Sequence, residues 1–433
     1  MMNLFWFRRD LRLQDNCALY YALKENKNVQ AIFIFDTEIL DDLEIKEDRR
    51  ISFIYETIQK LKNELNKLGA DLWVFYGNPM DIINTLTQKH SINSIYLNRD
   101  YEPYATTRDA EIEIFCNSQN ITFKTFKDQV IFEKLEIAKA DGKPYTVFTP
   151  YMKKWKINLN LATTTKAFPT KIHFENFNKI SSIQKLISVK ELGFVKVPHI
   201  VPKLNILHKT IKEYHVTRDL LAIEGTSRLS VHLRFGTISI RELVKVAMNT
   251  NETYLNELIW REFYMQILWN FPQIVSQNFK KKYNGIEWNT NEEDFEKWCS
   301  AHTGYPIVDA AMNQLLQTGF MHNRARMIVA SFLTKHLLID WRKGEAFFAK
   351  HLSDYELSSN NGGWQWAAST GCDAVPYFRI FNPYIQTERF DNNQIYIKKW
   401  GGEQGIEPIV DHKEARERCL QVYSKALTEY NPN

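Results

Sequence analysis

The sequence predicts two folded parts, an α/β domain with a Rossmann-like parallel sheet at the amino terminus and an all-α domain at the carboxyl terminus. In residues 1–128, short runs rich in β-branched and aromatic residues alternate with amphipathic stretches of helical period. Beyond residue 203, helical periods dominate. The 433 residues, 44% of them hydrophobic, are enough to bury the cores of two such domains.

The expected strands of the α/β domain are short and apolar. A helix is expected between the second and third strands, at residues 49–68, where isoleucine and leucine recur at helical spacing. Strands that alternate with helices form a parallel sheet covered by helices. The crevice beyond the strand ends is a usual ligand position, although no Gly-x-Gly-x-x-Gly follows the first strand. The expected strands are residues 4–8, 29–35, 71–76, 94–98 and 122–126.

Residues 129–202 are irregular and polar, with several prolines and a run of three threonines. This composition indicates a linker that crosses the surface between domains. Residues 203–433 then predict the helical domain, because strand signals are few and apolar residues recur at helical spacing. The clearest expected helices are residues 240–248, 255–269, 307–316 and 327–338.

Composition and termini restrict the class of protein. A formal charge of +4 is only mildly basic, so a polyanion would have to be met by a local patch. The five cysteines lack Cys-x-x-Cys pairs and metal-ligand spacing, which argues against a zinc site and fits a reducing cytosol. The amino terminus does not resemble a secretion signal, and no stretch reaches the roughly 18 apolar residues of a membrane span. We therefore expect a cytoplasmic protein without a metal and without a membrane segment.

The motif Gly225-Thr-Ser-Arg-Leu-Ser230 places small residues, hydroxyl groups and a guanidinium group directly before a helical stretch. Backbone amides and hydroxyls at such a turn can hold a diphosphate, and Arg228 adds positive charge. A helix cap beside a solvated arginine explains the same residues equally well. The motif alone leaves both interpretations open.

Two helical stretches carry polar residues that could line a cleft. Glu257 and Trp260 are three residues apart and share a helix face, where a carboxyl group and an indole can together hold a planar base. Asn323, Arg324 and Arg326 cluster at the start of a long apolar helix. A buried tryptophan beside a surface glutamate, and a capped helix with surface arginines, are the competing interpretations.

The segment Asn360-Asn-Gly-Gly-Trp-Gln-Trp366 predicts an irregular turn, because consecutive Asn and Gly residues favour turns that expose backbone and amide groups. Positions two apart on a helix diverge by about 200°, so Trp364 and Trp366 are expected to face different surroundings. One of the two indoles could serve an internal cofactor and the other an external pocket.

Together these segments closely resemble the photolyase and cryptochrome family, and in detail its class I cyclobutane pyrimidine dimer DNA photolyases. The resemblance runs from Phe5-Trp-Phe-Arg-Arg-Asp-Leu-Arg-Leu13 to Tyr377-Phe-Arg-Ile-Phe-Asn-Pro383 and covers nearly the whole chain. It implies a deoxyribodipyrimidine photo-lyase, with an α/β antenna domain (residues 1–128) and a helical FAD-binding catalytic domain (residues 203–433). It also implies that FAD acts as the fully reduced anion and repairs dimers in DNA under blue light.

The resemblance also assigns the flavin contacts. Asn360 matches the residue beside the reactive flavin nitrogen, and Arg326 and Asp354 match an ion pair against the ring. Glu356 stands where relatives usually have Asp, so the contact to the imide side of the ring can differ. The residues implied to bind FAD are Tyr214, Thr226, Ser227, Leu229, Arg261, Arg326, Asp354, Glu356 and Asn360.

Three further groups of residues match functional positions of the family. The dimer pocket corresponds to Glu257, Trp260, Asn323, Met327 and Trp366. The chain of tryptophans that carries electrons between the surface and FAD corresponds to Trp288, Trp341 and Trp364. The DNA face corresponds to Arg218, Arg261, Arg324 and Arg379, whose contacts with phosphates would give salt-dependent affinity without reading sequence.

Individual residues distinguish between several types of protein within the family. A cryptochrome-type photoreceptor that acts through a protein partner is disfavoured, because Glu257, Trp260, Met327 and Trp366 keep the dimer-repair identities. DASH-type members usually carry Tyr in place of Trp366 and Gln in place of Met327, and a histidine-rich six-four pocket is absent.

We expect a monomer. A folate antenna is disfavoured, because residues 100–109 lack the Asn-Glu pair of folate-binding relatives, which leaves a deazaflavin, a flavin or no second chromophore.

Overall fold

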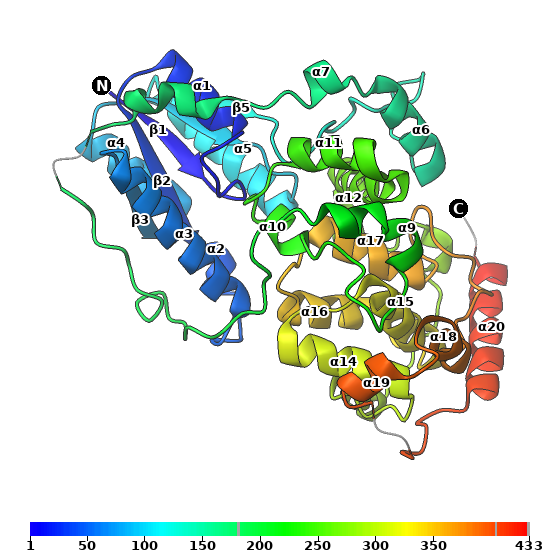
Figure 1. Ribbon diagram of the computed structural model, residues 1–433. Coiled ribbons are helices and arrows are strands. Elements are labelled where there is room, and N and C mark those ends of the chain that lie inside the picture. Colours follow the sequence, from blue (N-terminus) through cyan, green and yellow to red (C-terminus); the bar gives the residue numbers. More distant parts are fainter. Residues whose placement is uncertain (180–181, 403–404, 431–433) are drawn as a thin grey trace. The chain divides into compact units, whose positions relative to one another are not determined.

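The computed structural model describes residues 1–179, 182–402 and 405–430. The chain divides into two compact units, each of which is built from stretches that interleave along the sequence (Figure 1). Unit 1 comprises Met1–Glu136, Trp155–Ile206 and Arg228–Asn249. Unit 2 comprises Ile137–Lys154, Leu207–Ser227 and Thr250–Asn433.

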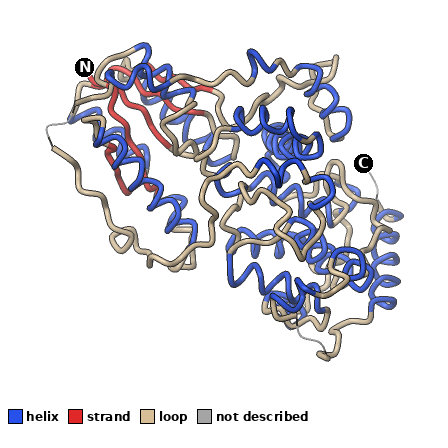
Figure 2. Tube along the Cα trace, viewed as in Figure 1, coloured by secondary structure: helices blue, strands red, loops and turns tan. Residues whose placement is uncertain are grey.

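Unit 1 contains a five-stranded parallel sheet of order β3-β2-β1-β4-β5, which confirms the predicted α/β fold (Figure 2). Each strand lies within about two residues of its predicted position, because buried apolar runs mark central parallel strands clearly. The strands are β1 (Met2–Phe7), β2 (Val29–Asp36), β3 (Leu72–Gly77), β4 (Ile92–Asn98) and β5 (Thr122–Phe126).

Alternate side chains of the sheet point to opposite faces, and each face is covered by helices. Phe5 and Phe7 of β1 pack in one core with the apolar residues of α1 (Cys17–Glu25) and α3 (Arg49–Lys67). Leu4 and Trp6 pack in the other core with those of α4 (Pro79–Lys89) and α5 (Pro103–Ser118). The short helix α2 (Thr37–Leu40) follows β2.

The segment Arg228–Asn249, which the sequence placed in the range 203–433, groups with unit 1. It contains α10 (Ser230–Arg234) and most of α11 (Ile240–Thr250). At Gly236 the chain passes so close to the segment after β1 that a Cβ atom would lie 2.1 Å from the carbonyl oxygen of Arg9, and φ is +63°. Only glycine fits this position without a shift of backbone.

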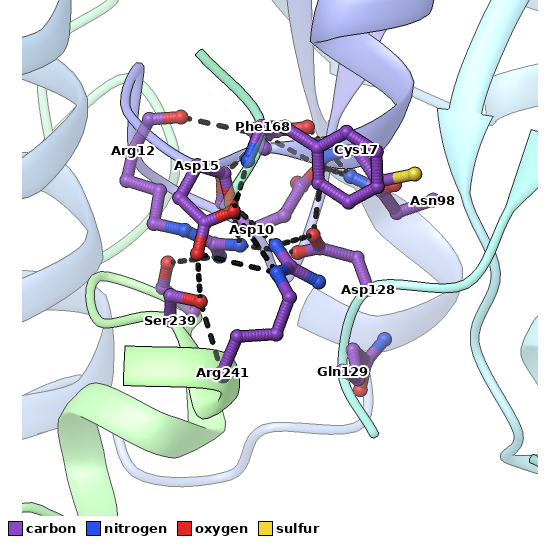
Figure 3. Close-up of polar contacts among 12 residues, drawn as sticks. Asp10, Arg12, Asp15, Cys17, Asn98, Asp128, Gln129, Phe168, Ser239 and Arg241 are labelled. Atoms are coloured by element: carbon purple, nitrogen blue, oxygen red, sulfur yellow. Dashed lines mark hydrogen bonds and ion pairs between the residues drawn. The ribbon is translucent and has the colours of Figure 1, made fainter. Parts of the chain in front are cut away.

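A buried polar network ties this segment to the segments after β1 and β5 (Figure 3). The carboxylate of Asp128 accepts hydrogen bonds from Arg12 at 2.6 Å and from Arg241 at 2.7 Å. Arg241 also donates to Asp15 at 2.9 Å, and the amide of Cys17 donates to Asp128. We call Arg12, Asp15, Asp128 and Arg241 the Asp128 network. Its four charges pair with one another, so they can be buried without an isolated charge.

The predicted linker, residues 129–202, is divided between the two units and holds short helices. Its helix α6 begins in unit 2 and ends in unit 1, and an isolated β-bridge joins Phe177 to Val29 of β2. The helical elements of this range are α6 (Phe148–Asn158), α7 (Leu161–Thr164) and η1 (Thr170–Asn176).

Unit 2 is built from helices in its described residues, which confirms the predicted all-helical part. One predicted helix, 327–338, is wrong in detail, because the α-helix stops at Ser331 and a π-helical turn follows. The elements are α8 (His208–Lys212), α9 (Tyr214–Thr217), α12 (Glu252–Asn270), η2 (Pro272–Val275), η3 (Lys281–Tyr283), α13 (Glu292–Cys299), α14 (Pro306–Thr318), α15 (Asn323–Ser331), η4 (Phe332–His336), α16 (Trp341–His351), α17 (Leu357–Ala367), α18 (Pro383–Phe390), α19 (Ile395–Lys399) and α20 (His412–Thr428).

The main core of unit 2 lies between α14, α15, α16 and α17. Trp298, Trp341 and Trp364 are among its fully or almost fully buried side chains. A smaller apolar cluster lies beneath α20. Among the described residues, no helix has both the length and the apolar character needed to cross a membrane.

Candidate active site

Helix α12 carries three of the predicted site residues. Asn251 caps its start by accepting a hydrogen bond from the amide of Tyr254, and the helix then presents Glu257, Trp260 and Arg261. Glu257 and Trp260 are three residues apart and lie on neighbouring positions of one face, as the sequence predicted. The carboxyl and the indole therefore stand side by side.

Trp260 is stacked on one aromatic ring and lies near another. The ring of Phe148, on α6, lies parallel to the indole with 3.7 Å between centroids and 7° between planes. Tyr264 lies 5.4 Å away at a tilt of 33°, and the backbone amide of Phe148 donates to Asp373 at 2.9 Å. One face of Trp260 is thus covered by Phe148, so a ligand that stacks on the indole must use the other face.

Sequence reasoning missed Phe148, because it lies more than 100 positions from Trp260 in a range that was predicted to be a linker. Its apolar character alone gave no signal of a role.

The carboxyl group of Glu257 accepts a hydrogen bond from the guanidinium group of Arg218. Burial raises the pKa of Glu257, and the positive charge of Arg218 opposes that rise. The side chains keep 29% and 27% of their surface exposed, so both remain within reach of a ligand. The pair therefore combines a carboxyl group that binds protons more readily than usual with a cation that can be drawn away from it.

Arg218 belongs to a longer run of charges. Its Nε lies 3.9 Å from Asp219, and Asp219 accepts a hydrogen bond from Arg324 at 2.8 Å. We call Glu257, Arg218, Asp219 and Arg324 the charge chain. Two arginines predicted to face DNA are thus held by carboxylates in this structure. Asp219 was not foreseen, since a single aspartate gives no motif.

The start of α15 brings the next group of predicted residues together. His322 caps the helix by accepting the amide of Arg324, and Asn323 contacts the sulfur of Met327 at 4.0 Å. Arg326 donates to both carboxylate oxygens of Asp354, at 3.0 and 2.9 Å. The ion pair that the resemblance implied between these two side chains is present.

The segment from Asn360 to Trp366 is helical, and the prediction of an irregular turn is wrong. Gly362 permits close packing of helices instead of a turn. A Cβ atom on Gly362 would lie 2.2 Å from the ring of Tyr264 on α12, and one on Gly344 of α16 would lie 2.2 Å from the ring of Trp364. The two glycines let α17 approach both neighbouring helices.

Along α17, the predicted residues face different surroundings. The side-chain amide of Asn360 donates to Glu345 of α16, at 3.0 Å to the carbonyl oxygen and 2.8 Å to the carboxyl oxygen. Burial raises the pKa of Glu345, although the hydrogen bond from Asn360 opposes the rise. Trp364 is 2% exposed within the core, whereas Trp366 is only half-buried and lines a small cavity with Tyr264 and Gly362.

The three predicted relay tryptophans differ in their hydrogen-bond partners. The indole nitrogen of Trp364 is buried and meets no acceptor in the described part of the chain. That of Trp341 donates to the side-chain amide oxygen of Asn278 at 2.8 Å. Trp288 is half-buried and makes an edge contact with Tyr423, with 6.2 Å between centroids. Trp298, buried 6.0 Å from Trp364, was not singled out in the sequence.

The remaining predicted residues are spread over both units. Tyr214 lies against Arg218 and Tyr254, and the hydroxyl of Tyr254 donates to Ser227 at 3.0 Å. Four predicted residues lie apart from Tyr214 and Ser227. Glu356 forms an ion pair with Arg261 at 3.4 Å, and Arg379 is exposed. Thr226 is half-buried in unit 2, and Leu229 is buried in unit 1.

The carboxyl ends of the strands in unit 1 are lined by arginines and carboxylates. The guanidinium groups of Arg8 and Arg108 lie 5.2 and 5.0 Å from the ring centroid of Trp6. Arg8 pairs with Asp109 at 2.6 Å, and Arg108 with Asp36 at 3.3 Å. The indole nitrogen of Trp6 is buried without a partner among the residues that are described. This is the edge of the sheet at which parallel sheets usually bind ligands.

Comparison with known proteins identifies the family. Residues 3–171 match the family model described as DNA photolyase, and residues 254–405 match the FAD binding domain of DNA photolyase. The chain belongs to the DNA photolyase family. The second match runs from α12 to beyond α19, so the FAD-binding domain includes Glu257, Arg326 and Asn360.

Curated relatives cover nearly the whole chain. The deoxyribodipyrimidine photo-lyase of a Synechococcus strain is 36% identical over 424 residues, which cover 92% of this chain and 87% of the relative. That of Escherichia coli is 34% identical over 474 residues, with 98% of each chain covered. These relatives are named as photo-lyases and not as photoreceptors.

Solved structures agree with the fold. A class III photolyase from Agrobacterium tumefaciens has a TM-score of 0.86 at 29% identity, over 99% of this chain and 98% of that one. An archaeal photolyase from Sulfolobus tokodaii, solved with two FAD molecules, has a TM-score of 0.84 at 32% identity, over 98% of this chain and 100% of that one.

The donor set of unit 2 fits a flavin dinucleotide. The Ser358 hydroxyl, in the first turn of α17, is buried without a hydrogen-bond partner among described residues, as a group that awaits a ligand or water would be. The Ser227 hydroxyl and the Arg261 guanidinium suit phosphate oxygens, while the Asn360 amide and the Arg326–Asp354 pair suit the polar edge of an isoalloxazine ring. No cluster of His, Cys, Asp and Glu in the described ranges could hold a metal ion.

Proposed function

We propose that this protein repairs cyclobutane pyrimidine dimers in DNA by light-driven electron transfer from reduced FAD. The observation that carries the proposal is the arrangement on α12, where a carboxyl group of raised pKa and a half-covered indole stand on one face of a helix inside the FAD-binding domain. A base that stacks on the open face of Trp260 can hydrogen-bond Glu257 at its edge.

In this proposal the flavin is held by polar contacts on several elements. Arg326, oriented by Asp354, lies against the ring, and Asn360, oriented by Glu345, lies beside its reactive nitrogen. When bound and reduced, FAD supplies the excited electron that opens the cyclobutane ring, and the protein supplies orientation and electrostatics. Tyr214, Thr226, Ser227, Leu229, Arg261 and Glu356 complete the proposed FAD contacts.

The dimer pocket is proposed to be formed by Glu257, Trp260, Asn323, Met327 and Trp366. Trp260 and Trp366 act as aromatic walls, and Phe148 fixes the plane of Trp260 by stacking on its other face. Protonated Glu257 donates a hydrogen bond to a carbonyl oxygen of the dimer, where negative charge develops after electron transfer. Because damage weakens base stacking, a dimer leaves the duplex more easily than an intact base pair.

The DNA face is proposed to include Arg218, Arg261, Arg324 and Arg379. Arg218 and Arg324 can exchange their carboxylate partners in the charge chain for phosphates, which a guanidinium group also binds through two parallel hydrogen bonds. When a phosphate draws Arg218 away, Glu257 loses the positive charge that lowers its pKa. Binding of DNA thereby favours the protonated, hydrogen-bond-donating form of Glu257.

We also infer that Trp364, Trp341 and Trp288 pass electrons from the protein surface toward oxidised FAD. Within residues 1–179, 182–402 and 405–430, the Trp364 indole has no acceptor for its proton, and Asn278 cannot take the proton of Trp341. Only the half-buried Trp288 is open enough to lose a proton to water. The oxidised site therefore settles on Trp288, whose radical becomes neutral when the proton leaves.

Repair of a thymine-dimer oligonucleotide under blue light tests the proposal. The reduced protein should restore thymines in light and not in the dark. Glu257→Gln should lower the yield of repair per absorbed photon, and Trp260→Ala should weaken binding of damaged DNA by roughly 1–3 kcal/mol, the worth of one stacked base. Glu252→Gln, at an exposed position on the same helix, is the matched control and should leave repair unchanged.

Loss of repair in a protein that still binds and photoreduces FAD would reject dimer repair. In that case, binding assays with six-four photoproducts and with partner proteins would decide between another repair specificity and a photoreceptor.

We further propose that the protein is a cytoplasmic monomer, because contact between one lesion and one pocket needs no second copy. Size-exclusion chromatography that gives a stable dimer contradicts this.

Any light-harvesting chromophore is proposed to be a deazaflavin or a flavin at the strand ends of unit 1, where Trp6, Arg8 and Arg108 lie. Chromatography of the heat-released chromophores distinguishes these from FAD alone.

A further inference from the structure

Lys335 is a fully buried lysine in the π-helical turn η4. Its ammonium nitrogen donates to the hydroxyl of Ser369 at 2.8 Å and lies 3.8 Å from the ring centroid of Tyr423, on α20. In the parts of the chain that are described, no carboxylate forms an ion pair with it. Burial has the largest effect on its pKa and lowers it to about 7. A buried, unpaired ammonium group is costly, so its retention calls for a reason.

The lysine stands where the tryptophan relay meets a group of tyrosines. Tyr423 is fully buried and contacts Trp288, the last tryptophan of the proposed relay, at 6.2 Å. Its ring is stacked on that of Tyr377, with 6.0 Å between centroids and 4° between planes. Tyr377 is half-buried and lies two residues before the exposed Arg379. A positive charge that passed from Trp288 to Tyr423 could therefore continue to the segment proposed to face DNA.

Two features of Tyr423 oppose its oxidation. Removal of an electron from a phenol makes its proton strongly acidic, but the Tyr423 hydroxyl donates to the backbone carbonyl of Ala368 at 2.9 Å, which cannot take up a proton. The Lys335 ammonium group faces the ring and repels any positive charge that develops on it. The attraction between a cation and a ring depends on the electron density that oxidation removes.

We propose that Lys335 ends the relay at Trp288 by keeping Tyr423 reduced. Lys335 is in this sense a positioning residue, and its role rests on the proposed relay of Trp364, Trp341 and Trp288. One electron leaves Trp288 toward the flavin side, the indole proton passes to water, and a thiol reductant in solution returns one hydrogen atom to the neutral indole radical. Tyr423 gives up neither an electron nor a proton.

The test is flash photolysis of the protein loaded with oxidised FAD, without added reductant, at a pH below 7, where the ammonium group keeps its proton. Transient absorption and electron paramagnetic resonance distinguish tryptophanyl from tyrosyl radicals. The ionisable groups that bear on Lys335 and Tyr423 are Cys419, Tyr283 and Asp340, and burial raises the pKa of Cys419 to about 11, so its thiol stays protonated in this range.

We expect the unmodified protein to form only a tryptophanyl radical. Lys335→Met, which removes the charge and keeps the length, should convert part of that signal into a tyrosyl signal, and Lys335→Met/Tyr423→Phe should restore the tryptophanyl signal. Lys425→Met, at an exposed site on α20, is the matched control and should behave like the unmodified protein. Tyr423→Phe alone should leave the lifetime of the tryptophanyl radical unchanged.

A tyrosyl radical in the unmodified protein, or its absence from folded, FAD-loaded Lys335→Met, would overturn the proposal. If Lys335→Met does not fold, a changed radical lifetime in Tyr423→Phe overturns it and an unchanged one supports it. Trp288→Phe tests the relay itself. Photoreduction of FAD at an unchanged rate would contradict the proposed relay, and with it the role of Lys335. Dimer repair by chemically reduced protein is measured separately, so failure of the repair function gives a different result.

Discussion

Buried charge is handled in opposite ways in the two units. In unit 1, the Asp128 network pairs two guanidinium groups with two carboxylates, and the side chains of Asp128 and Arg241 are 1% and 5% exposed. In unit 2, Lys335 is buried just as deeply, but its neighbours among the described residues are a hydroxyl and an aromatic ring instead of a carboxylate. Paired charges hold the segment Arg228–Asn249 in place, whereas the unpaired charge weakens the fold and so indicates a role outside stability.

Asp128→Asn removes the carboxylate shared by both arginines of the Asp128 network, and we expect it to have the largest effect on stability. The substitution leaves the guanidinium groups of Arg12 and Arg241 with less negative charge in a buried site, which should lower the free energy of unfolding by about 3–5 kcal/mol. Urea denaturation followed by circular dichroism measures this. Glu25→Gln removes an exposed ion pair with Lys124 in the same unit and should change stability by less than about 1 kcal/mol.

The loss caused by Asp128→Asn should depend on pH. Burial alone would raise the pKa of Asp128, but Arg12 and Arg241 outweigh burial and lower it. A carboxyl whose pKa is lower in the folded than in the unfolded protein stabilises above its unfolded pKa, and that contribution disappears as the pH falls through the folded value. The difference between the variant and the unmodified protein should therefore shrink in acid. A loss as small as that of Glu25→Gln at neutral pH would show that the network does not hold unit 1 together.

Lys335→Met should have a smaller effect of the opposite sign. Replacing a buried, unpaired charge by an apolar side chain of similar length should raise the free energy of unfolding by about 1–4 kcal/mol. Burial holds the pKa of Lys335 at about 7, below its ordinary value of 10.5. Between these values the unfolded chain binds the proton that the folded protein has lost, so the unmodified protein gains stability as the pH rises.

The gain from Lys335→Met should accordingly be largest below pH 7 and fade as the pH approaches 10.5. Thermal denaturation of both proteins across this range measures the difference in their stability. Groups that titrate alike in both proteins contribute equally to both and do not affect this difference. A destabilised variant at every pH would mean that Lys335 is held by favourable contacts, and the contrast between the two units would fail.

The sequence was sufficient to predict the sheet, because each strand is a short apolar run between turn residues. It could not predict that Arg228–Asn249 belongs with the sheet, because Arg241 meets Asp15 and Asp128 only after folding brings together residues more than 100 positions apart. The helix at Asn360 was missed for a related reason. Gly362 reads as a turn residue in sequence, and its role in admitting the ring of Tyr264 depends on another helix.

The candidate site was predictable where residues lie on one element or match a family motif. Glu257 and Trp260 were singled out by their spacing on one helix, and the resemblance assigned them, as well as Arg326 and Asp354, to the site. Lys335 was hidden inside an apolar stretch that predicted one continuous helix. The π-helical turn η4 adds a residue to the local turn and buries Thr334, Lys335 and His336 together, which no simple helical period describes.

The charge chain of unit 2 is paired, like the Asp128 network, but it is partly exposed, so we expect Arg218→Gln to have the smallest effect of these substitutions. Its members are partly exposed, so the fold should tolerate the change. Binding of damaged DNA should weaken by about 1–2 kcal/mol, and the slope of log affinity against log salt should fall by about 1, because one phosphate contact is lost. Fluorescence anisotropy at several salt concentrations measures both.

Arg218→Gln should also raise the pKa of Glu257, because the guanidinium charge that opposes the effect of burial is gone. The pH at which repair declines on the alkaline side should then move upward if the protonated carboxyl is the active form. Lys212→Gln, at an exposed basic position of α8, is a control that removes one positive charge without touching the charge chain. An equal loss of affinity in both variants would mean that Arg218 adds only to the general positive field and does not couple DNA to Glu257.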